Sequence, residues 1–338
     1  MKLTFEQIKS AVCGAARVEE KEGYICFYRF TKEQEELYKT VKEDFYKKTF
    51  ATAGVRIAFR TNSKKLCLSA LFEQASSRTY FAVDIAVNGQ YIGSLDNCGG
   101  GEVFFENERE NYPLGEFSGE FLLGDGEKEV MIYLPWSCSA KLSELSLDDG
   151  VSFVPVKREK QILMIGDSIT QGYCAVRPSK RYAAMLADTL DAEERNKAIG
   201  GEIFRPELAA LRDEGYEPDY ITVAYGTNDW AVRSYDEFCK NCKGFYENIS
   251  ANYPKSKIFA IAPIWRADCE KEVAFGAFPK IAESIKQITE PLENVVFIDA
   301  FDCVPKEEKY FADLYLHPND AGFEHYAKNL VKKIKQYI

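Results

Sequence analysis

The stretch Ile162–Tyr173, ILMIGDSITQGY, decides the fold of the second half of the chain. Residues Ile162–Ile165 are apolar without alternation, which predicts a strand covered on both faces, as in the centre of a parallel α/β sheet. Such sheets bind ligands at the carboxyl ends of their strands. Gly166 lets the chain turn there, Asp167 can hold the turn, and Ser168 then lies over the sheet edge, where a serine can act as a nucleophile. Taken alone, the motif also fits a strand-ending turn with a capping serine.

The rest of the second half alternates short apolar runs with helical patterns, which predicts a parallel sheet wrapped by helices. A closing helix is expected over Asp320–Ile338, because its apolar residues recur on one side. The expected strands are Ile162–Ile165, Glu194–Ile199, Tyr220–Ala224, Lys257–Ile261 and Val295–Ile298.

The first half shows a different pattern of many short strands without helices between them, which predicts a β-sandwich. A short helical lead-in precedes these strands, and Thr31 with Gln34 predicts a capped helix carrying Leu37, Val41 and Phe45. Asn88-Gly89 predicts a two-residue hairpin. The expected strands are Val55–Phe59, Leu66–Leu71, Tyr80–Val87, Tyr91–Leu95, Phe104-Phe105, Gly119–Leu123, Val130–Leu134 and Leu142–Leu147.

Length and composition indicate a two-domain globular protein. A chain of 338 residues exceeds the usual size of one core, and the segment 154–160 is the expected junction, giving domains 1–155 and 156–338. No apolar run approaches the ~20 residues that cross a bilayer. Glu6 and Lys9 interrupt the N-terminal apolar residues, so we expect no secretory signal and a cytoplasmic location. A net charge of −10 argues against nucleic acid and anionic membranes as partners.

The ten cysteines fit a reduced protein in which they fill the core. Cys239 and Cys242 form a C-x-x-C pair, but Ser234 and Glu237 make a capping box that places both cysteines in a helix. No second cysteine pair or histidine pair completes a zinc set, so packing is favoured over metal binding. We therefore expect neither a metal nor an organic cofactor.

Three further turns carry chemically useful residues. Segments 196–202 and 226–230 follow expected strands, and segment 316–319 precedes the final helix. A serine nucleophile needs a base and donors for the oxyanion, and these turns supply an imidazole, a glycine amide and an asparagine amide. The chain has two histidines: His325 falls within the expected helix, whereas His317 lies in a loop before a proline. An isolated His-Pro would otherwise indicate a solvated loop histidine.

Taken together, Gly166-Asp167-Ser168, 196–201, 226–229 and 317–319 resemble the four motif blocks of the SGNH, or GDSL-type, esterase and acylhydrolase superfamily. The resemblance covers about Ile162–Ile338 and implies a flavodoxin-like α/β/α domain. It further implies that Ser168 attacks an ester carbonyl while His317 takes its proton. The amides of Ser168 and Gly201 and the side chain of Asn228 would hold the oxyanion.

The β-rich first half resembles the N-terminal jelly roll of carbohydrate esterases of family two, which remove acetyl groups from sugars. Trp230 follows the oxyanion asparagine, and Tyr173 and Trp265 fall near other strand ends, so an aromatic platform for a sugar ring is one interpretation. Core packing is the alternative for each of them. No long apolar lid lies beside the motifs and Trp230 crowds the oxyanion turn, which favours an acetyl group.

One position departs from the superfamily pattern. The pattern places an aspartate three residues before the histidine, where this chain has Leu314, and the nearest acid is Asp313, four residues before His317. A helical turn or bulged loop would let Asp313 orient the imidazole. Otherwise a backbone carbonyl would do so, as in some relatives of family two, leaving a Ser168–His317 dyad.

These observations predict a serine esterase that removes short acyl groups, above all acetyl groups, from O-acetylated carbohydrates through an acyl-enzyme. The alternatives are a general short-chain lipase or thioesterase and a non-catalytic carbohydrate-binding protein. The presence of Ser168, Gly201, Asn228 and His317 counts against the last. The sugar, the acylated position and the oligomeric state stay open at this point.

Overall fold

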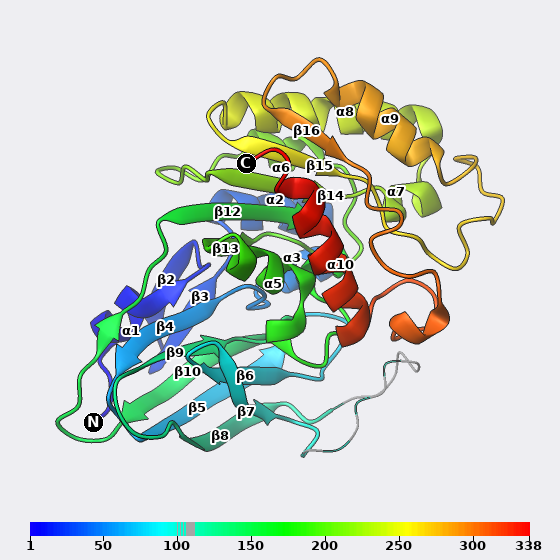
Figure 1. Cartoon of the computed structure of the whole chain (residues 1–338). Helices are drawn as coiled ribbons and strands as arrows, with labels where there is room; N and C mark the ends of the chain where they lie inside the picture. Colours follow the sequence, from blue (N-terminus) through cyan, green and yellow to red (C-terminus); the bar gives the residue numbers. More distant parts are fainter. Residues whose placement is uncertain (100, 102, 104, 106–111) are drawn as a thin grey trace.

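The computed structural model describes residues 1–99, 101, 103, 105 and 112–338 of the chain. In the second half, β12 (Lys160–Gly166) lies inside a five-stranded parallel sheet with the order β13-β12-β14-β15-β16 (Figure 1). Numbered along the chain this order is 2-1-3-4-5, the flavodoxin-like one, which binds ligands between its first and third strands. Those two strands are β12 and β14. The others are β13 (Ala192–Asn196), β14 (Tyr220–Ala224), β15 (Lys257–Ile261) and β16 (Val295–Ile298).

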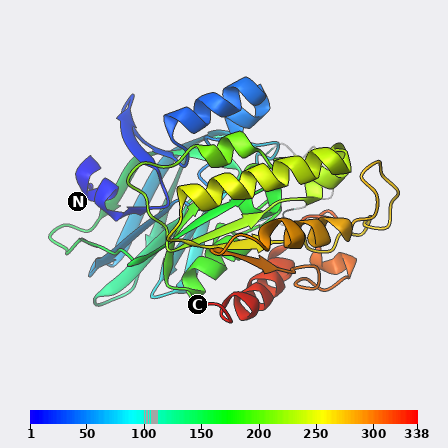
Figure 2. The ribbon, with the colours of Figure 1, turned by 90° about the horizontal axis from the view of Figure 1, so that it is seen from above.

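Helices cover both faces of this sheet (Figure 2). Ile162 and Met164 of β12 join the apolar cluster of α5 (Tyr182–Thr189) and α10 (Asp320–Ile334), whereas Leu163 and Ile165 join that of α8 (Tyr235–Asn252) and α9 (Lys280–Thr289). The unbroken apolar run of β12 is thus explained by burial on two sides. Shorter helices are α4 (Ser168–Gln171), α6 (Pro206–Ala210), α7 (Thr227–Val232) and the 3₁₀ turns Pro178–Lys180 and Glu308–Tyr310.

The expected bounds of β14, β15 and β16 are confirmed, and α10 ends four residues before the predicted end. β13 was predicted too late in the chain, because three of its five residues, Glu193, Glu194 and Arg195, are charged. Glu194 is fully buried in the sheet, and Arg181 of the loop before α5 pairs with its carboxylate at 2.8 Å. The paired charge lets a polar segment occupy a buried strand. The apolar residues after Asn196, Ala198 and Ile199, lie in the loop that follows the strand.

The first half consists of two antiparallel sheets that share one apolar core, a β-sandwich. One sheet has the order β1-β4-β9-β6-β7, with β11 also paired to β4, and the other has the order β2-β3-β10-β5-β8. Their strands are β1 (Val12–Cys13), β2 (Arg17–Lys21), β3 (Tyr24–Tyr28), β4 (Arg56–Thr61), β5 (Lys65–Gln74), β6 (Ala82–Val87), β7 (Gln90–Asp96), β8 (Gly115–Leu122), β9 (Lys128–Tyr133), β10 (Cys138–Leu147) and β11 (Val154–Pro155).

Most strands predicted in this half are present, and Asn88-Gly89 forms the predicted hairpin turn with positive φ at both residues. The hairpin β2–β3 was missed, because β2 is largely charged. Phe104 lies outside the described residues, and Phe105 is buried but not in a strand. The helical lead-in is α1 (Phe5–Ala11). The capped helix is α2 (Lys32–Val41), which ends before Phe45, a residue of the separate helix α3 (Glu43–Lys48).

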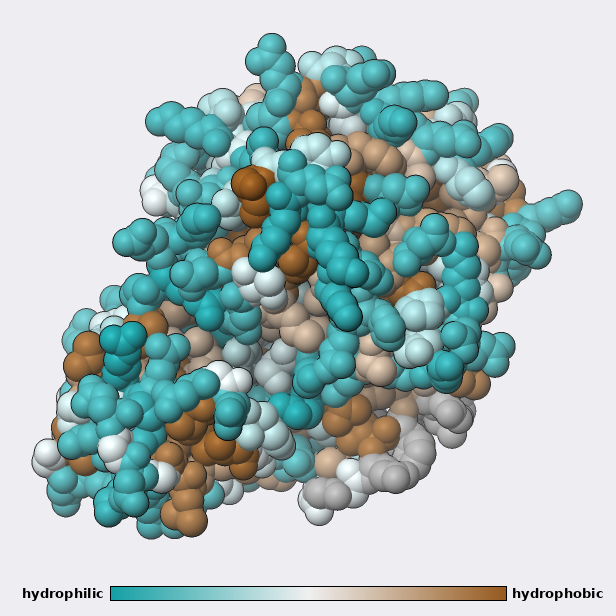
Figure 3. Space-filling model, viewed as in Figure 1, coloured by the Kyte–Doolittle hydropathy of each residue, from teal (hydrophilic) through white to brown (hydrophobic). Residues whose placement is uncertain are grey.

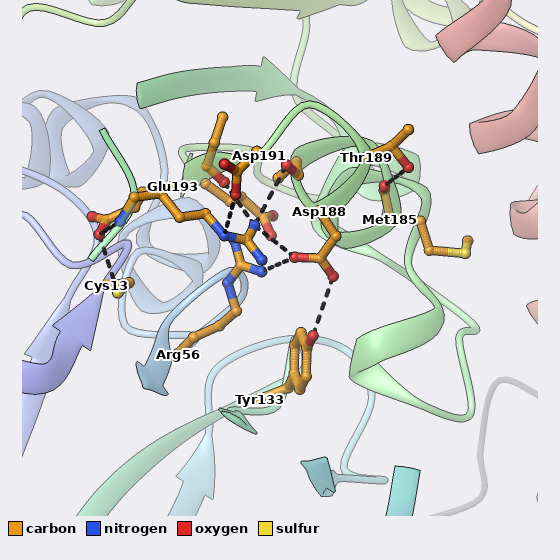
Figure 4. Close-up of polar contacts among 12 residues, drawn as sticks. Cys13, Arg56, Tyr133, Met185, Asp188, Thr189, Asp191 and Glu193 are labelled. Carbon is orange, nitrogen blue, oxygen red and sulfur yellow. Dashed lines mark hydrogen bonds and ion pairs between the residues drawn. The ribbon is translucent and has the colours of Figure 1, made fainter. Parts of the chain in front are cut away.

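The two halves share a buried interface. Trp136, 2% exposed, donates its indole N–H to the carbonyl of Ala175 at 2.9 Å and belongs to the same apolar cluster as β12. A second contact is ionic (Figure 4): Arg56 of β4 and Tyr133 of β9 both bind Asp188 of α5, at 2.6 and 3.1 Å. Although burial raises the pKa of Asp188, the nearby guanidinium groups lower it below its usual value. The carboxylate therefore stays ionised within the interface.

The face seen in Figure 3 is mainly hydrophilic, with apolar side chains in small groups. This agrees with the 28% of charged residues in the chain. Among the helices of the described residues, none combines the length and apolarity that a bilayer crossing requires.

Candidate active site

The turn after β12 presents Ser168. The Asp167 carboxylate accepts a hydrogen bond from the amide of Ile169 at 3.0 Å and so caps α4, whose first residue is Ser168. Gly166 is required here, because a Cβ on it would lie 2.2 Å from the hydroxyl of Thr170. The hydroxyl of Ser168 is therefore held at the carboxyl end of the strand, next to the boundary between β12 and β14.

His317 links Ser168 to an acid. Its Nε2 lies 2.8 Å from the Ser168 Oγ, and its Nδ1 lies 2.6 Å from the Oδ2 of Asp313. The ring of Tyr173 stacks against the imidazole with a centroid distance of 5.7 Å. A proton on Nδ1 binds the carboxylate, which leaves Nε2 free to accept the serine proton. His325, by contrast, lies on α10 against Tyr310.

The four-residue spacing between acid and histidine is accommodated by a closed loop. Phe311 pairs with Pro318 across its base, and the other oxygen of Asp313, Oδ1, accepts the amides of Leu316 and His317 at 2.8 and 3.0 Å. Leu314 takes up the extra residue in a left-handed conformation with φ 66°. Of the two alternatives raised by the sequence, the structure has the bulged loop with a carboxylate at Nδ1.

The charge state of Asp313 follows from these contacts. Burial raises the pKa of this carboxyl. The hydrogen bond and charge of His317, together with the backbone amides, lower it by more, so that the pKa is about 2. Asp313 is therefore an anion throughout the neutral range, as a residue that stabilises an imidazolium must be.

The turns after β13 and β14 lie at the same edge of the sheet, because these two strands flank β12. Ile199 donates its amide to the carbonyl of Gly166 at 3.1 Å, which joins the Gly200-Gly201 turn to the nucleophile turn. Gly201 is exposed and has φ +88°, a conformation that favours glycine. Asn228, at the start of α7, donates one amide hydrogen to the carbonyl of Glu202 at 2.9 Å and carries a second hydrogen on the same nitrogen.

Trp230 does not lie where the sequence placed it. The side chain is 2% exposed, its indole N–H binds the carbonyl of Gly276 at 2.9 Å, and its ring meets the edge of Phe278. The prediction that it binds substrate or crowds the oxyanion turn is therefore wrong, because α7 turns this residue into the core. Tyr173 is buried beside His317, and Trp265 is half-buried against the ring of Phe311.

Two buried carboxyls lie near the site, and the sequence indicated a role for one of them, Asp167, in holding the turn. Asp167 is 3% exposed and Asp229 is fully buried, and burial raises the pKa of each to about 7. Asp229 accepts the amide of Phe204 at 3.3 Å and so supports the chain just after the Gly201 turn. The sequence signal of Asp167 is its position directly after a buried strand, where charged groups are costly, whereas Asp229 lies within α7 and has no such signal.

The C-x-x-C pair lies in α8, whose capping box of Ser234 and Glu237 is confirmed. Cys242 is fully buried in the apolar cluster of this helix, and Cys239 packs against it. Within the described ranges, no group of three or more histidine, cysteine, aspartate or glutamate side chains could hold a metal ion. The pair is therefore part of the core.

The segment 196–201, which we call the amide turn, is also held by a residue that the sequence gave no reason to select. Arg29, fully buried, donates from one guanidinium nitrogen to the carbonyls of Asn196 and Ala198, at 2.8 and 3.0 Å. Burial lowers its pKa to about 9, so the group keeps its proton at neutral pH. The contact spans 167 residues of sequence, which no local pattern can report.

Residues 164–325 match the model of the GDSL-like Lipase/Acylhydrolase family. Among curated proteins, none matches the sequence significantly. The chain does resemble solved structures over nearly its whole length. The salicylyl-acyltransferase SsfX3 from a tetracycline biosynthetic pathway is 18% identical, with a TM-score of 0.78 and coverage of 96% of this chain and 94% of that chain.

A putative GDSL-like lipase from Bacteroides ovatus is 19% identical, with a TM-score of 0.77 and coverage of 99% and 97% of the two chains. A family two carbohydrate esterase from Cellvibrio japonicus is 16% identical, with a TM-score of 0.66 and coverage of 98% and 96%. At these identities the likeness shows the shared fold. It extends over the β-sandwich as well as the parallel sheet.

Proposed function

We propose that this chain, whose residues 164–325 match the model of the GDSL-like Lipase/Acylhydrolase family, is a serine esterase that acts on short acyl esters through an acyl-enzyme. The observation that carries the proposal is the unbroken row of hydrogen-bonding groups from Ser168 through His317 to Asp313, with separations of 2.8 and 2.6 Å. Nucleophile, base and orienting acid stand in the order that acyl transfer requires.

In the first half-reaction, Ser168 Oγ attacks the ester carbonyl carbon while His317 Nε2 takes the hydroxyl proton. The carbonyl π electrons move onto oxygen, and the amides of Ser168 and Gly201 with the side chain of Asn228 bind this oxyanion. When the oxyanion collapses, the C–O bond breaks and the imidazolium returns its proton to the leaving alcohol. Water then repeats the sequence on the acyl-enzyme and regenerates Ser168. Asp313 stabilises the imidazolium throughout.

For the substrate we propose an acetyl ester of a carbohydrate. The whole-length likeness to family two carbohydrate esterases, one solved in complex with cellohexaose, supports a sugar and supports a jelly-roll assignment for the β-sandwich. Phe45 of α3 supports a small acyl group, because its ring lies 3.6 Å from the position that a Cβ on Gly201 would take. Bulk beside the proposed oxyanion turn disfavours long chains.

The reaction type is tested by Ser168→Ala in the full-length protein with an activated acetyl ester. We expect turnover to fall by about 10⁴- to 10⁶-fold, the loss seen when a serine hydrolase is deprived of its nucleophile. The control is Ser284→Ala, which removes a buried hydroxyl that contacts Tyr235 at 2.9 Å on the far face of the sheet. Retained activity in a folded Ser168→Ala variant would overturn the mechanism.

The substrate is tested with acetylated sugars and with esters of rising chain length. We expect acetyl esters to be cleaved faster than octanoyl esters, and the reverse order would favour a general lipase or thioesterase. Addition of an acceptor alcohol distinguishes hydrolysis from transfer, the activity named for the structurally similar SsfX3. Sugar binding without cleavage of any ester would favour a non-catalytic carbohydrate-binding protein.

A further inference from the structure

The direction of the Gly201 amide depends on the carbonyl that precedes it. A peptide group is planar and trans, so the C=O of Gly200 and the N–H of Gly201 point in opposite directions. Two successive glycines leave this peptide free to rotate, because neither has a Cβ to restrict φ and ψ. Any group that fixes the Gly200 carbonyl oxygen therefore also fixes where the Gly201 N–H points.

Lys48 of the N-terminal half binds this carbonyl. Its ammonium nitrogen lies 2.9 Å from the Gly200 oxygen, and the residue is 7% exposed. The Asp44 carboxylate, one turn earlier on α3, lies 2.6 Å from the same nitrogen and balances its charge. Phe45, between them in sequence, lies beside Gly201, with the Lys48 ammonium 5.3 Å from its ring. One short helix thus packs a cation and an aromatic ring against the turn.

Arg29 fixes the C-terminal end of α3 and also the chain that leads from β13 into the Gly200-Gly201 turn. Arg29 donates to the carbonyl of Lys48 at 3.0 Å with one nitrogen and to Asn196 and Ala198 with another. The backbone of Lys48 and the chain leading into Gly200 therefore share one rigid support. From the other side, the amide of Gly200 is bound by the side-chain oxygen of Gln171 at 2.8 Å.

The geometry points to Lys48 as a positioning residue that aims the Gly201 N–H at the oxyanion, an inference that rests on the proposed esterase function. A charged donor on the carbonyl oxygen both fixes the peptide plane and polarises the amide, which strengthens the N–H as a donor. The effect is expected in the transition state, where the oxyanion carries its charge, and not in substrate binding. Loss of Lys48 should therefore lower kcat and leave KM nearly unchanged.

The test compares Lys48→Met with Lys128→Met in the full-length protein. Lys128 is a matched control, because it is 4% exposed and also donates to backbone carbonyls, those of Ser63 and Gly124 at 2.8 Å, within the β-sandwich. With an acetyl ester, we expect Lys48→Met to lower kcat by about 10- to 100-fold, less than the full loss of one oxyanion donor. KM should stay within about threefold, and Lys128→Met should keep kcat within about twofold while losing stability. Lys48→Arg, which keeps a charged donor, should recover most of kcat.

A second measurement uses an alkylboronic acid, which adds to a serine hydroxyl to give a tetrahedral adduct resembling the oxyanion. Its Kd should rise in Lys48→Met by the factor by which kcat falls, and should not change in Lys128→Met. Equal kcat and Kd for the two variants would overturn the role of Lys48 while the wild-type protein stays active. A wild-type protein without turnover would instead overturn the proposed function, and this inference with it. If circular dichroism shows Lys48→Met to be unfolded, Lys48→Gln takes its place in the same comparison.

Discussion

The histidine loop and the amide turn both contact the nucleophile turn and are held in different ways. The loop is closed by its own residues: Phe311 pairs with Pro318, and Asp313 binds both the amide and the ring of His317. The amide turn is held from a distance, because Arg29 contacts it across 167 residues of sequence. The loop with Asp313 and His317 is therefore a local structure, whereas the turn proposed to bind the oxyanion depends on the N-terminal half.

The largest effect is expected in the histidine loop from Asp313→Asn, which keeps the size of the side chain but removes the anion. We expect turnover to fall by about 10⁴-fold, as in a triad whose histidine loses its correct tautomer. The measurement is kcat with an activated acetyl ester. Asp299→Asn is the control, since Asp299 also accepts an amide two residues on, at 3.0 Å, in an exposed loop. A loss of tenfold or less would favour a Ser168–His317 dyad.

The amide turn loses its support in Arg29→Met, because the buried carbonyls of Asn196 and Ala198 are left without this donor. We expect the free energy of unfolding to fall by about 3–5 kcal/mol, the cost of removing one partner from a buried ionic or hydrogen-bonded set. Urea unfolding measures it. Arg60→Met is the control, because Arg60 is exposed and its ion pair with Glu129, at 3.8 Å, should contribute at most about 1 kcal/mol. Similar losses in both variants would show that the Arg29 contacts add nothing specific.

Asn228→Ala tests the amide turn through catalysis. Removal of one oxyanion donor should lower kcat by about 10²- to 10³-fold. Asn248→Ala is the matched control, because the side-chain amide of Asn248 also binds a backbone carbonyl, that of Pro206, at 2.9 Å. A loss below about threefold for Asn228→Ala would remove this residue from the oxyanion hole.

The histidine loop and the amide turn also differ in the charge of the carboxyls buried in or near them, which predicts a pH dependence of stability. Asp313 has a lowered pKa of about 2, whereas Asp229 beside the amide turn and Asp167 have raised pKa values of about 7. Groups with raised pKa values bind more protons in the folded state, so their stabilisation is present below about pH 4 and is lost as the pH rises to about 7. Arg233 and Arg266 oppose this shift, and Glu202 adds to it.

We therefore expect the free energy of unfolding to fall between pH 5 and 7, by at most about 1.4 kcal/mol per pH unit for each such group. Asp229→Asn should flatten this slope in urea unfolding, because it removes one titrating group. Asp313 affects the slope only below about pH 4. Its stabilisation is present above that pH and is lost as the carboxylate is protonated. A slope identical in both proteins would contradict the assignment to Asp229.

The smallest effect concerns the strained residue of the histidine loop. Leu314→Gly relieves the strain of a left-handed backbone conformation at a residue that is 46% exposed. Glycine also gives the unfolded chain more freedom, which opposes this gain. The two terms nearly cancel, so we expect a rise in the free energy of unfolding of about 0.5 kcal/mol, with kcat unchanged. Leu122→Gly, at an exposed site of the regular strand β8, should have the opposite sign.

The same contrast explains what the sequence could predict. β15 has four consecutive apolar residues that are all buried, and the capping box at Ser234 lies within four positions, so local patterns suffice. The proximity of Ser168 and His317 was anticipated because Ser168 follows a strand end, His317 lies in the loop before the final helix, and both lie in segments that resemble known motif blocks. Trp230 was misplaced because its position after a strand does not show which way the helix turns it.

Pairings between distant charges gave no such signal. Glu194 in β13 is buried because Arg181 binds it, and Arg29 is buried because the amide turn supplies carbonyls. In each case the sequence shows only a charged residue, whose ordinary location is the surface. The partner is set by the tertiary fold, and the residue types alone do not identify it.

Arg29 has a consequence for recombination of such chains. A parallel-sheet half joined to a foreign β-domain would keep Ser168, His317 and Asp313, since these are positioned by their own strand and loop. It would arrive without the guanidinium that binds Asn196 and Ala198 and without the ammonium that binds Gly200. Such a chimera would carry a complete set of named motifs and an oxyanion turn with no fixed orientation. The donors in the N-terminal half and the carbonyls that they bind in the parallel-sheet half must therefore come from the same parent chain. Exchange of either half alone would separate them.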